Sequence, residues 1–308
     1  MEQILINLGF FAVSLFVLLK ASDFFVESAE RIGLAAGIPP FIIGVTIVAL
    51  GTSLPELASS IEAVLMGDSK IVIGNVAGSN IANIALVLGL VAVLGKQIKV
   101  KEGIMNIDIP ILVSSAFLLW FVTYDQVVTI FEAILLLGAL VIFLFYSLNN
   151  DEGEETEKTK INAKDIGVLI VAGIAIKFSA EYTIKSIIEL SKLLGIGSEV
   201  IAASVVALGT SLPEVFVSLA AIRKGKTDIA VGNILGSNIF NTYAVMGIPA
   251  LVGVLVIPDN VVNFVLPFMV ALTLLFAVMC ISKKISRWEG LMLLLFYGLF
   301  MVELFSGL

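Results

Sequence analysis

The sequence contains no histidine and one cysteine, and only 14% of its 308 residues are charged. Without histidine, neither a Ser-His or Cys-His catalytic pair nor a histidine-ligated metal can form. The single cysteine, Cys280, cannot make an intrachain disulfide. A G-x-x-x-x-G-K-[ST] phosphate loop is also missing, which argues against ATP hydrolysis, and the net charge of −7 is unlike that of a nucleic-acid-binding protein. These absences argue against most enzyme classes.

Apolar residues make up 59% of the chain, and the mean hydropathy is +1.10. Because soluble domains carry roughly 45–50% apolar residues, the chain is predicted to be an all-α polytopic membrane protein. A bilayer core of about 30 Å needs about 20 residues per helix. On that scale the sequence predicts ten transmembrane helices, at 4–34, 40–66, 71–94, 104–123, 127–148, 164–194, 198–222, 228–252, 261–281 and 288–306. The start lacks a basic region and a cleavage site, so we expect no signal peptide.

The lysines and arginines are distributed unevenly among the predicted loops. With the N-terminus outside, 13 of the 18 lie on the inner side, two (Lys70 and Lys192) lie on the outer side, and three lie within helices. Positive residues favour the cytoplasmic side, so both termini are predicted to be outside. The acidic stretch 149–163 is predicted to be a cytoplasmic linker between two halves, 1–148 and 164–308.

An internal repeat relates the two halves. The segment Ala49–Glu56, Ala-Leu-Gly-Thr-Ser-Leu-Pro-Glu, recurs letter for letter at Ala207–Glu214, and the G-N-x-x-G-S-N-I-x-N motif of Gly74–Asn83 recurs at Gly232–Asn241. Both pairs are offset by 158 residues. Each copy is predicted to contain five helices, an odd number, so the second copy must be inverted in the membrane. Inverted repeats typically form a substrate site at their interface near the bilayer midplane.

The repeated motifs are rich in oxygen ligands. Pro55 and Pro213 are expected to kink or unwind their helices and so to free the backbone oxygens of Gly51 and Gly209. Several polar side chains recur at i, i+4 or i+7 spacing and so share a helical face. Oxygen ligands without sulfur or imidazole suit Ca²⁺, Na⁺ or Mg²⁺. The candidate ligands are Ala49, Thr52, Ser53, Glu56, Ser79 and Asn83 in the first copy, and Ala207, Thr210, Ser211, Glu214, Ser237 and Asn241 in the second.

The two glutamates favour a functional interpretation. A charged side chain at the bilayer centre costs at least about 2.5 kcal/mol, and neither motif contains a lysine or arginine to pair with Glu56 or Glu214. Cation binding explains both acids, although protonated packing residues are the alternative. The glycines of the two G-x-x-x-G motifs are expected to bring helices close together. The four remaining motif asparagines are expected to bond to backbone; they are Asn75, Asn80, Asn233 and Asn238.

The first and sixth segments are too long to stand upright in the bilayer core, since about 30 residues make a helix near 45 Å long. Each begins apolar and then becomes charged, and Lys177, Glu181 and Lys185 are spaced to pair along one face. We expect both helices to tilt steeply. As a matched pair they are candidates for the moving element of a transporter.

The paired motifs resemble the alpha repeats of the sodium/calcium exchangers, within the calcium/cation antiporter superfamily, and are most similar to the prokaryotic members. The resemblance implies Ca²⁺ coordination by Glu56 and Glu214 with the backbone oxygens of Thr52 and Thr210. It also implies Na⁺ sites around Ser53, Ser211, Ser79 and Ser237, assisted by the carbonyls of Ala49 and Ala207, with Asn83 and Asn241 beside the central site. Some relatives carry aspartate where Asn241 stands.

The leading interpretation is therefore Na⁺-coupled Ca²⁺ antiport by alternating access in a prokaryotic plasma membrane. Exchange of Ca²⁺ for H⁺ is the nearest alternative, but proton-coupled relatives resemble a G-N-x-x-E-H pattern, whereas Gly78-Ser79 and Gly236-Ser237 occur here. A channel and an intramembrane protease are less compatible with the inverted repeat and the missing catalytic residues. Ca²⁺ and Na⁺ are expected as substrates, with no cofactor and no obligate protein partner.

Overall fold

The computed structural model describes residues 2–95, 97–100, 104–149, 160–193 and 211–306. The elements of the first half are α1 (Glu2–Ala35), α2 (Pro40–Ile43), η1 (Gly44–Val48), α3 (Ala49–Leu65), α4 (Lys70–Ile81), η2 (Ala82–Leu88), α5 (Gly89–Gly95), β1 (Gln97–Lys99), η3 (Ile104–Asp108), α6 (Ile109–Val122), β2 (Val127–Val128) and α7 (Ile130–Asn149). Those of the second are α8 (Ala163–Leu193), α10 (Leu212–Arg223), α11 (Thr227–Phe240), η4 (Asn241–Val245), α12 (Met246–Val252), β3 (Leu255–Val256), η5 (Val261–Val265), α13 (Leu266–Cys280), β4 (Lys284–Ser286) and α14 (Arg287–Ser306). Here η denotes a π-helix.

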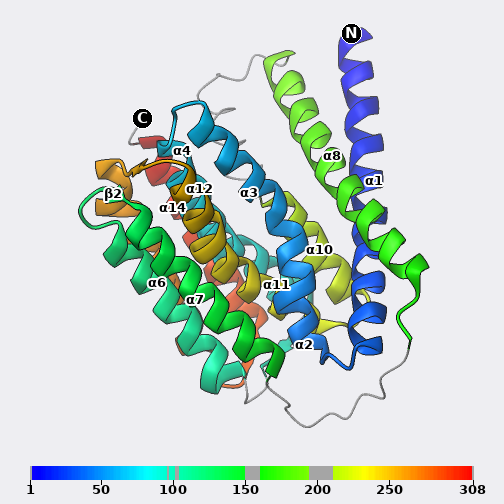
Figure 1. The fold of residues 1–308 in the computed structure, drawn as a ribbon. Coiled ribbons are helices and arrows are strands. Elements are labelled where there is room, and N and C mark those ends of the chain that lie inside the picture. Colours follow the sequence, from blue (N-terminus) through cyan, green and yellow to red (C-terminus); the bar gives the residue numbers. More distant parts are fainter. Residues whose placement is uncertain (1, 96, 101–103, 150–159, 194–210, 307–308) are drawn as a thin grey trace.

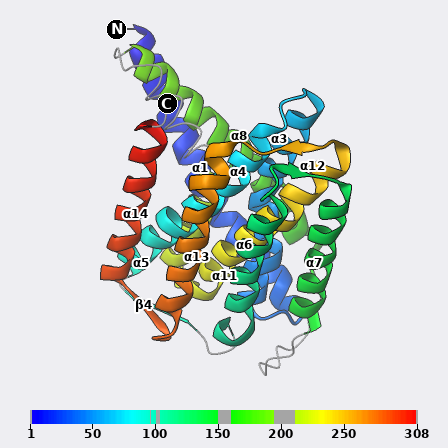
Figure 2. The ribbon, with the colours of Figure 1, turned by 90° about the vertical axis from the view of Figure 1, so that its left-hand side faces the viewer.

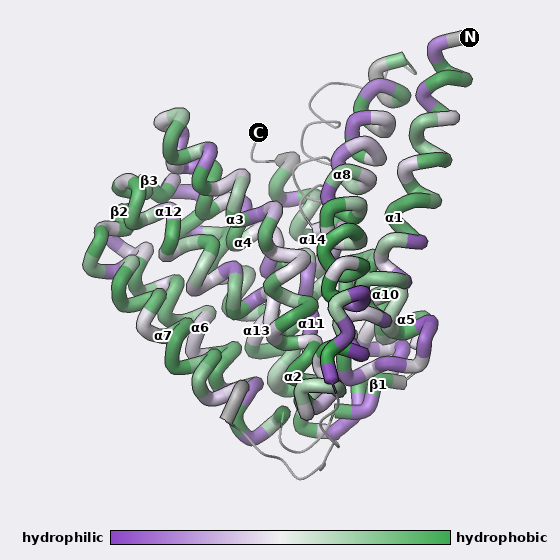
Figure 3. Tube along the Cα trace, turned by 45° about the vertical axis from the view of Figure 1, so that its right-hand side comes forward, coloured by the Kyte–Doolittle hydropathy of each residue, from purple (hydrophilic) through white to green (hydrophobic). Residues whose placement is uncertain are grey.

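The helices follow the apolar runs of the sequence. Seven of the described helical stretches are long and apolar enough to cross a membrane: Gln3–Ala35, Pro40–Leu65, Lys70–Gly95, Ile104–Val122, Ile130–Ser147, Ala163–Leu190 and Val261–Cys280. Figure 3 shows apolar residues over most of the helices, while hydrophilic ones gather near α10 and β1. This arrangement, with apolar side chains facing outward as well as inward, is that of a polytopic membrane protein.

The two halves are joined by matching contacts. Strand β1 pairs antiparallel with β4, and β2 pairs antiparallel with β3. The 158-residue offset carries β1 onto the position of β3 and β2 onto that of β4, so the two small sheets are equivalent under the repeat. The π-helices η2 and η4, and likewise η3 and η5, fall at nearly equivalent positions under the same offset.

The elements that carry the repeated motifs lie in the interior of the bundle. Helix α11 packs against η1 and α3, while η2 and α3 also contact α10, and Figures 1 and 2 show the other helices around them. Gly232 and Gly236 permit this close packing, because an added Cβ would lie 2.4 Å from the Phe41 oxygen or 2.3 Å from the Val45 oxygen. The expected close approach is thus confirmed for the second G-x-x-x-G motif.

The first G-x-x-x-G motif behaves differently within the described residues. A Cβ added at Gly74 or Gly78 would meet none of their atoms within 4 Å. The segment that the repeat would place opposite these glycines, 199–207, lies outside the described residues.

The α-helix is not unwound at Pro55, contrary to what the sequence predicts, whereas the backbone before Pro213 that the prediction concerns lies at 194–210, outside the described residues. Helix α3 continues as an α-helix through Pro55, and Pro213 lies at the second residue of α10, where a missing backbone donor is tolerated. Gly209 lies outside the described residues. A single proline removes only one backbone bond, and the packing of α3 against α11 and α12 supports the helix. The departure from regular α-helix in this segment is instead the π-helix η1, which ends at Val48, just before Ala49.

Helices α1 and α8 pack mainly against each other and extend past the rest of the bundle (Figures 1 and 2). In Figure 2 they slant relative to α13 and α14, as their length predicts. The Thr183 hydroxyl donates to Ser14 Oγ at 3.0 Å, and Arg31 Nε lies 2.7 Å from Asp165 Oδ1. Of the predicted pairs along α8, Glu181 and Lys185 are confirmed at 2.6 Å.

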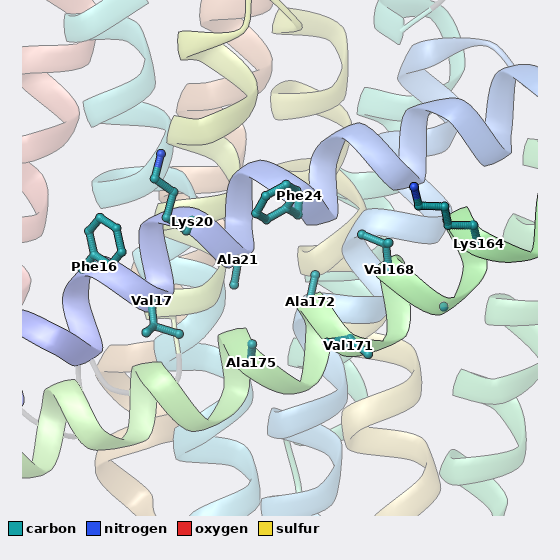
Figure 4. Close-up of a pocket in the computed structure, with 11 residues that line it drawn as sticks. Phe16, Val17, Lys20, Ala21, Phe24, Lys164, Val168, Val171, Ala172 and Ala175 are labelled. Carbon is teal, nitrogen blue, oxygen red and sulfur yellow. The ribbon is translucent and has the colours of Figure 1, made fainter.

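Other ion pairs tie the end of α1 to the turn between α10 and α11. Lys224 Nζ lies 2.5 Å from Glu27 Oε1, and Lys226 pairs with Glu30. Elsewhere α1 borders cavities with apolar walls. One of about 590 Å³ lies between α1 and α8 and is lined by Val17, Ala21 and Ala172 among others (Figure 4). Another of about 620 Å³ separates α1 and α8 from α3. Apolar cavities therefore border this pair of helices, both between α1 and α8 and on the side that faces α3.

Candidate cation site

Two buried carboxylates, one from each half, occupy the interior. Glu56 lies on α3 and is 1% exposed, and Glu214 lies in the first turn of α10 and is 0% exposed. Within the described residues, neither carboxylate has a hydrogen-bond partner or a basic partner. Burying a charge without compensation is very unfavourable, so this pair demands a positive species or a proton.

Further polar atoms without partners belong to the predicted ligand set. Among the described residues, buried side-chain atoms that make no hydrogen bond include both carboxylates, Ser53 Oγ, Ser211 Oγ and both amide atoms of Asn83 and Asn241. Buried polar groups are almost always hydrogen-bonded, and exceptions need an explanation. Six predicted site residues share this exception, so their buried polar atoms require a partner that the described side chains and backbone do not supply.

Local backbone geometry contributes to the arrangement. Asn83 is the second residue of η2, and Asn241 is the first residue of η4. Single π-helical turns inside α-helices often occur at functional sites. Because the two π-helices fall at nearly equivalent positions of the repeat, the two asparagines are presented by the same local structure in both halves.

Hydroxyl groups from the two halves meet beside the carboxylates. Thr52 Oγ1 lies 3.2 Å from the Ala49 carbonyl oxygen, 3.2 Å from Asn233 Oδ1 and 3.3 Å from Ser237 Oγ. Ser79 is also buried. The predicted ligands Ala49, Thr52 and Ser237 are therefore in direct proximity, although more than 180 residues separate Thr52 from its partners in the second half. Ala207 and Thr210 lie outside the described residues.

The remaining asparagines bond largely as the sequence predicts. Asn75 Nδ2 donates to the Glu56 carbonyl at 3.3 Å, Asn80 Nδ2 to the Asn238 carbonyl at 3.3 Å, and Asn238 Nδ2 to the Ile234 carbonyl at 2.6 Å. Asn233 differs, because the bonds that its side chain makes within the described part of the chain are to other side chains.

Two serines that the motif analysis missed support these asparagines. Asn75 Nδ2 donates to Ser60 Oγ at 3.0 Å, and Asn233 Nδ2 donates to Ser218 Oγ at 2.9 Å. Ser60 and Ser218 are themselves offset by 158 residues, so extending the repeat beyond the identical motifs would have found them.

Comparison with known proteins identifies the family. The family model described as "Sodium/calcium exchanger protein" matches residues 6–149 and again 164–305. The chain belongs to the sodium/calcium exchanger family. The exchanger is 35% identical to "Sodium/calcium exchanger MaX1" of Methanosarcina acetivorans, over 98% of this chain and 99% of MaX1. It is 31% identical to the inner membrane protein YrbG of Escherichia coli, over 93% of this chain and 92% of YrbG.

A solved structure of the sodium-calcium exchanger NCX_Mj, soaked with Na⁺ and Sr²⁺, has the same fold. It superimposes with a TM-score of 0.84 and is 31% identical, with 96% of this chain and 97% of NCX_Mj covered. An NCX_Mj structure soaked without Na⁺ and Ca²⁺ gives a TM-score of 0.86. The exchanger is thus a polytopic membrane protein of a cation-exchange family, not of an enzyme family.

Proposed function

We propose that this chain exchanges Na⁺ for Ca²⁺ across the membrane by alternating access, with the cations held near the bilayer midplane by residues of both repeats. The observation that carries the proposal is the pair Glu56 and Glu214, buried without partners and accompanied by unpartnered oxygens of Ser53, Ser211, Asn83 and Asn241. Oxygen ligands of this kind suit Ca²⁺ and Na⁺. The twelve residues of the sequence motifs form the proposed ligand set, and no cofactor is needed.

Charge balance explains why occupancy would alternate. The two carboxylates carry a charge of −2, which one Ca²⁺ or two Na⁺ neutralise. Binding Ca²⁺ and two Na⁺ together would leave a net charge of +2 in a site that water does not reach, and uncompensated buried charge is costly. The two ions therefore exclude one another, which is the requirement for exchange. Glu56 and Glu214, with the Thr52 and Thr210 backbone oxygens, are the proposed Ca²⁺ ligands, and the serines with the Ala49 and Ala207 carbonyls the proposed Na⁺ ligands.

Helices α1 and α8 are the proposed moving element. They contact each other more than the rest of the bundle, and apolar cavities lie between them and beside α3. Sliding over an apolar surface breaks few directional bonds. The ion pairs of Glu27 and Glu30 with Lys224 and Lys226 are the contacts that such motion would have to break.

The complete topology is part of the proposal. We propose ten transmembrane helices with both termini outside, arranged as inverted repeats at 1–148 and 164–308 around a cytoplasmic linker at 149–163. The lysine and arginine distribution supports this orientation. We place the protein in the plasma membrane of a prokaryotic cell and expect a monomer to contain the complete site, because all the ligands come from one chain.

Transport by purified protein in liposomes tests the function. Vesicles loaded with Na⁺ are diluted into Na⁺-free medium that contains labelled Ca²⁺, with a protonophore present to dissipate any pH gradient. We expect Ca²⁺ uptake that stops when Na⁺ is equal on both sides. Uptake that ignores the Na⁺ gradient and instead follows a pH gradient would establish Ca²⁺/H⁺ exchange and overturn the proposal.

A further inference from the structure

Asn233 sits at the centre of the hydroxyl cluster, although it is none of the ligands proposed above. Its side chain is fully buried on α11, one helical turn before Ser237. The amide oxygen Oδ1 lies 3.2 Å from Thr52 Oγ1 and 3.5 Å from Ser237 Oγ. The amide nitrogen Nδ2 donates to Ser218 Oγ at 2.9 Å. One side chain therefore connects α3, α10 and α11.

The orientation of this amide follows from the repeat. In the first half, Asn75 makes the equivalent bond to Ser60, and its Nδ2 also faces the Glu56 carbonyl oxygen, which can only accept a hydrogen bond. Nδ2 of Asn75 must therefore be the atom on that side. By the same arrangement, Nδ2 of Asn233 faces Ser218, and Oδ1 faces the two hydroxyls. Asn233 is consequently an acceptor toward Thr52 and Ser237.

An acceptor at this position controls how the hydroxyls present themselves to a cation. A hydroxyl has one hydrogen to donate and two lone pairs. When the hydrogens of Thr52 and Ser237 point toward Asn233 Oδ1, the lone pairs point elsewhere and can bind a positive ion. Without the acceptor, the Thr52 hydrogen is left with the Ala49 carbonyl oxygen or Ser237 Oγ, and the Ser237 hydrogen with Thr52 Oγ1. Each of these donations occupies an oxygen that would otherwise be available to the ion.

We propose that Asn233 is a positioning residue that holds the Thr52 and Ser237 hydroxyls in the orientation required for Na⁺ binding. This inference rests on the proposed Na⁺/Ca²⁺ exchange. It adds an ion-specific role, because Ser237 is a proposed Na⁺ ligand, whereas the Ca²⁺ ligands are the glutamates and the Thr52 backbone oxygen. Loss of the acceptor should weaken Na⁺ binding more than Ca²⁺ binding.

The test compares Na⁺ and Ca²⁺ affinities in three variants of the full chain. Asn233→Leu removes the acceptor at similar side-chain volume, whereas Asn233→Asp keeps an oxygen facing both hydroxyls. Asn75→Leu is the matched control, since Asn75 occupies the equivalent position but its Oδ1 accepts no hydrogen bond from any residue that the structure describes. The half-saturating concentrations of Na⁺ and Ca²⁺ are measured by exchange in liposomes, and Na⁺ competition against bound Ca²⁺ is measured by calorimetry on the purified protein.

We expect Asn233→Leu to raise the half-saturating Na⁺ concentration about threefold to tenfold, the effect of losing one such hydrogen bond, with Ca²⁺ affinity changed less than twofold. Asn233→Asp should bind Na⁺ at least as well as the natural chain, and Asn75→Leu should shift Na⁺ affinity less than Asn233→Leu does. An equal loss for both ions, an equal Na⁺ shift in both leucine variants, or an unchanged Na⁺ affinity in Asn233→Leu would overturn the inference.

Two further measurements keep the result decisive. If Asn233→Leu does not fold, Ser218→Ala replaces it, because removal of the Ser218 hydroxyl leaves the amide without its anchor; we expect a smaller shift, again specific for Na⁺. If the natural chain shows Ca²⁺ uptake without Na⁺ dependence, the proposed function fails and this inference fails with it. Na⁺ dependence in the natural chain with no ion-specific change in either variant overturns only the role of Asn233.

Discussion

Replacing Glu56 by glutamine tests the electrostatic core of the proposed site. The substitution keeps the shape of the side chain and removes one of the two buried negative charges. With Ca²⁺ bound, Glu214 would then be the one remaining carboxylate of the pair, and the site would carry a net charge of +1. Among the described residues, no further charged group hydrogen-bonds to this pair and could compensate that charge. An uncompensated buried charge costs about 3–5 kcal/mol.

That cost corresponds to a hundredfold to several thousandfold weaker Ca²⁺ binding, since about 1.4 kcal/mol is a factor of ten. One Na⁺ would still neutralise the remaining carboxylate, so Na⁺ should still bind. We therefore expect Glu56→Gln to abolish Na⁺-driven Ca²⁺ uptake in liposomes, while calorimetry detects Na⁺ but no Ca²⁺ binding in the micromolar to millimolar range.

The matched control is Glu62→Gln, because Glu62 lies on the same helix and is exposed. It changes the net charge equally but leaves the interior untouched, so transport should remain near that of the natural chain. Ca²⁺ binding retained in Glu56→Gln would refute the assignment of this carboxylate as a ligand. Equal losses in both variants would show that net charge, and not the buried site, determines transport.

Three more predictions follow from particular contacts. Gly236→Val should destabilise the protein by more than about 4 kcal/mol, seen as a lower melting temperature in detergent, because its Cβ would lie 2.3 Å from the Val45 oxygen. Gly138→Val on α7 is the control, because a Cβ there would meet no described atom within 4 Å, and a stable Gly236→Val would contradict the close packing. Glu27→Gln should lower stability by at most about 1 kcal/mol, because its pair with Lys224 is partly exposed, but should change the transport rate if α1 moves; an unchanged rate would argue against motion at this contact. Asn241→Asp adds a third buried carboxylate without a partner, so transport should require one more positive charge and become more sensitive to pH than in the natural chain; identical pH profiles would show that residue 241 lies outside the ion site.

Much of the fold follows from local sequence. The apolar runs predict the helix boundaries to within a few residues for most of the described segments, because the bilayer sets helix length and backbone bonds must be satisfied within each helix. The 158-residue offset relates β1 to β3 and β2 to β4 as well as the identical motifs. The same repetition identifies Glu56 and Glu214 as an unusual pair, since no basic residue accompanies either one.

Other features depend on contacts that local sequence does not encode. Helix α3 continues through Pro55 because neighbouring helices support it, whereas the proline alone predicts a break. The pairing of β1 with β4, and the meeting of Thr52 with Asn233 and Ser237, join residues more than 180 positions apart. Composition and periodicity specify which face of a helix is polar, but not which polar face of the other repeat it meets. The sequence by itself therefore determined the helices, the repeat and the chemistry of the candidate ligands. Only the tertiary structure decided which of these residues meet and that Asn233 Oδ1 accepts hydrogen bonds from Thr52 and Ser237, because side chains from distant segments come within bonding distance only when the two repeats pack together.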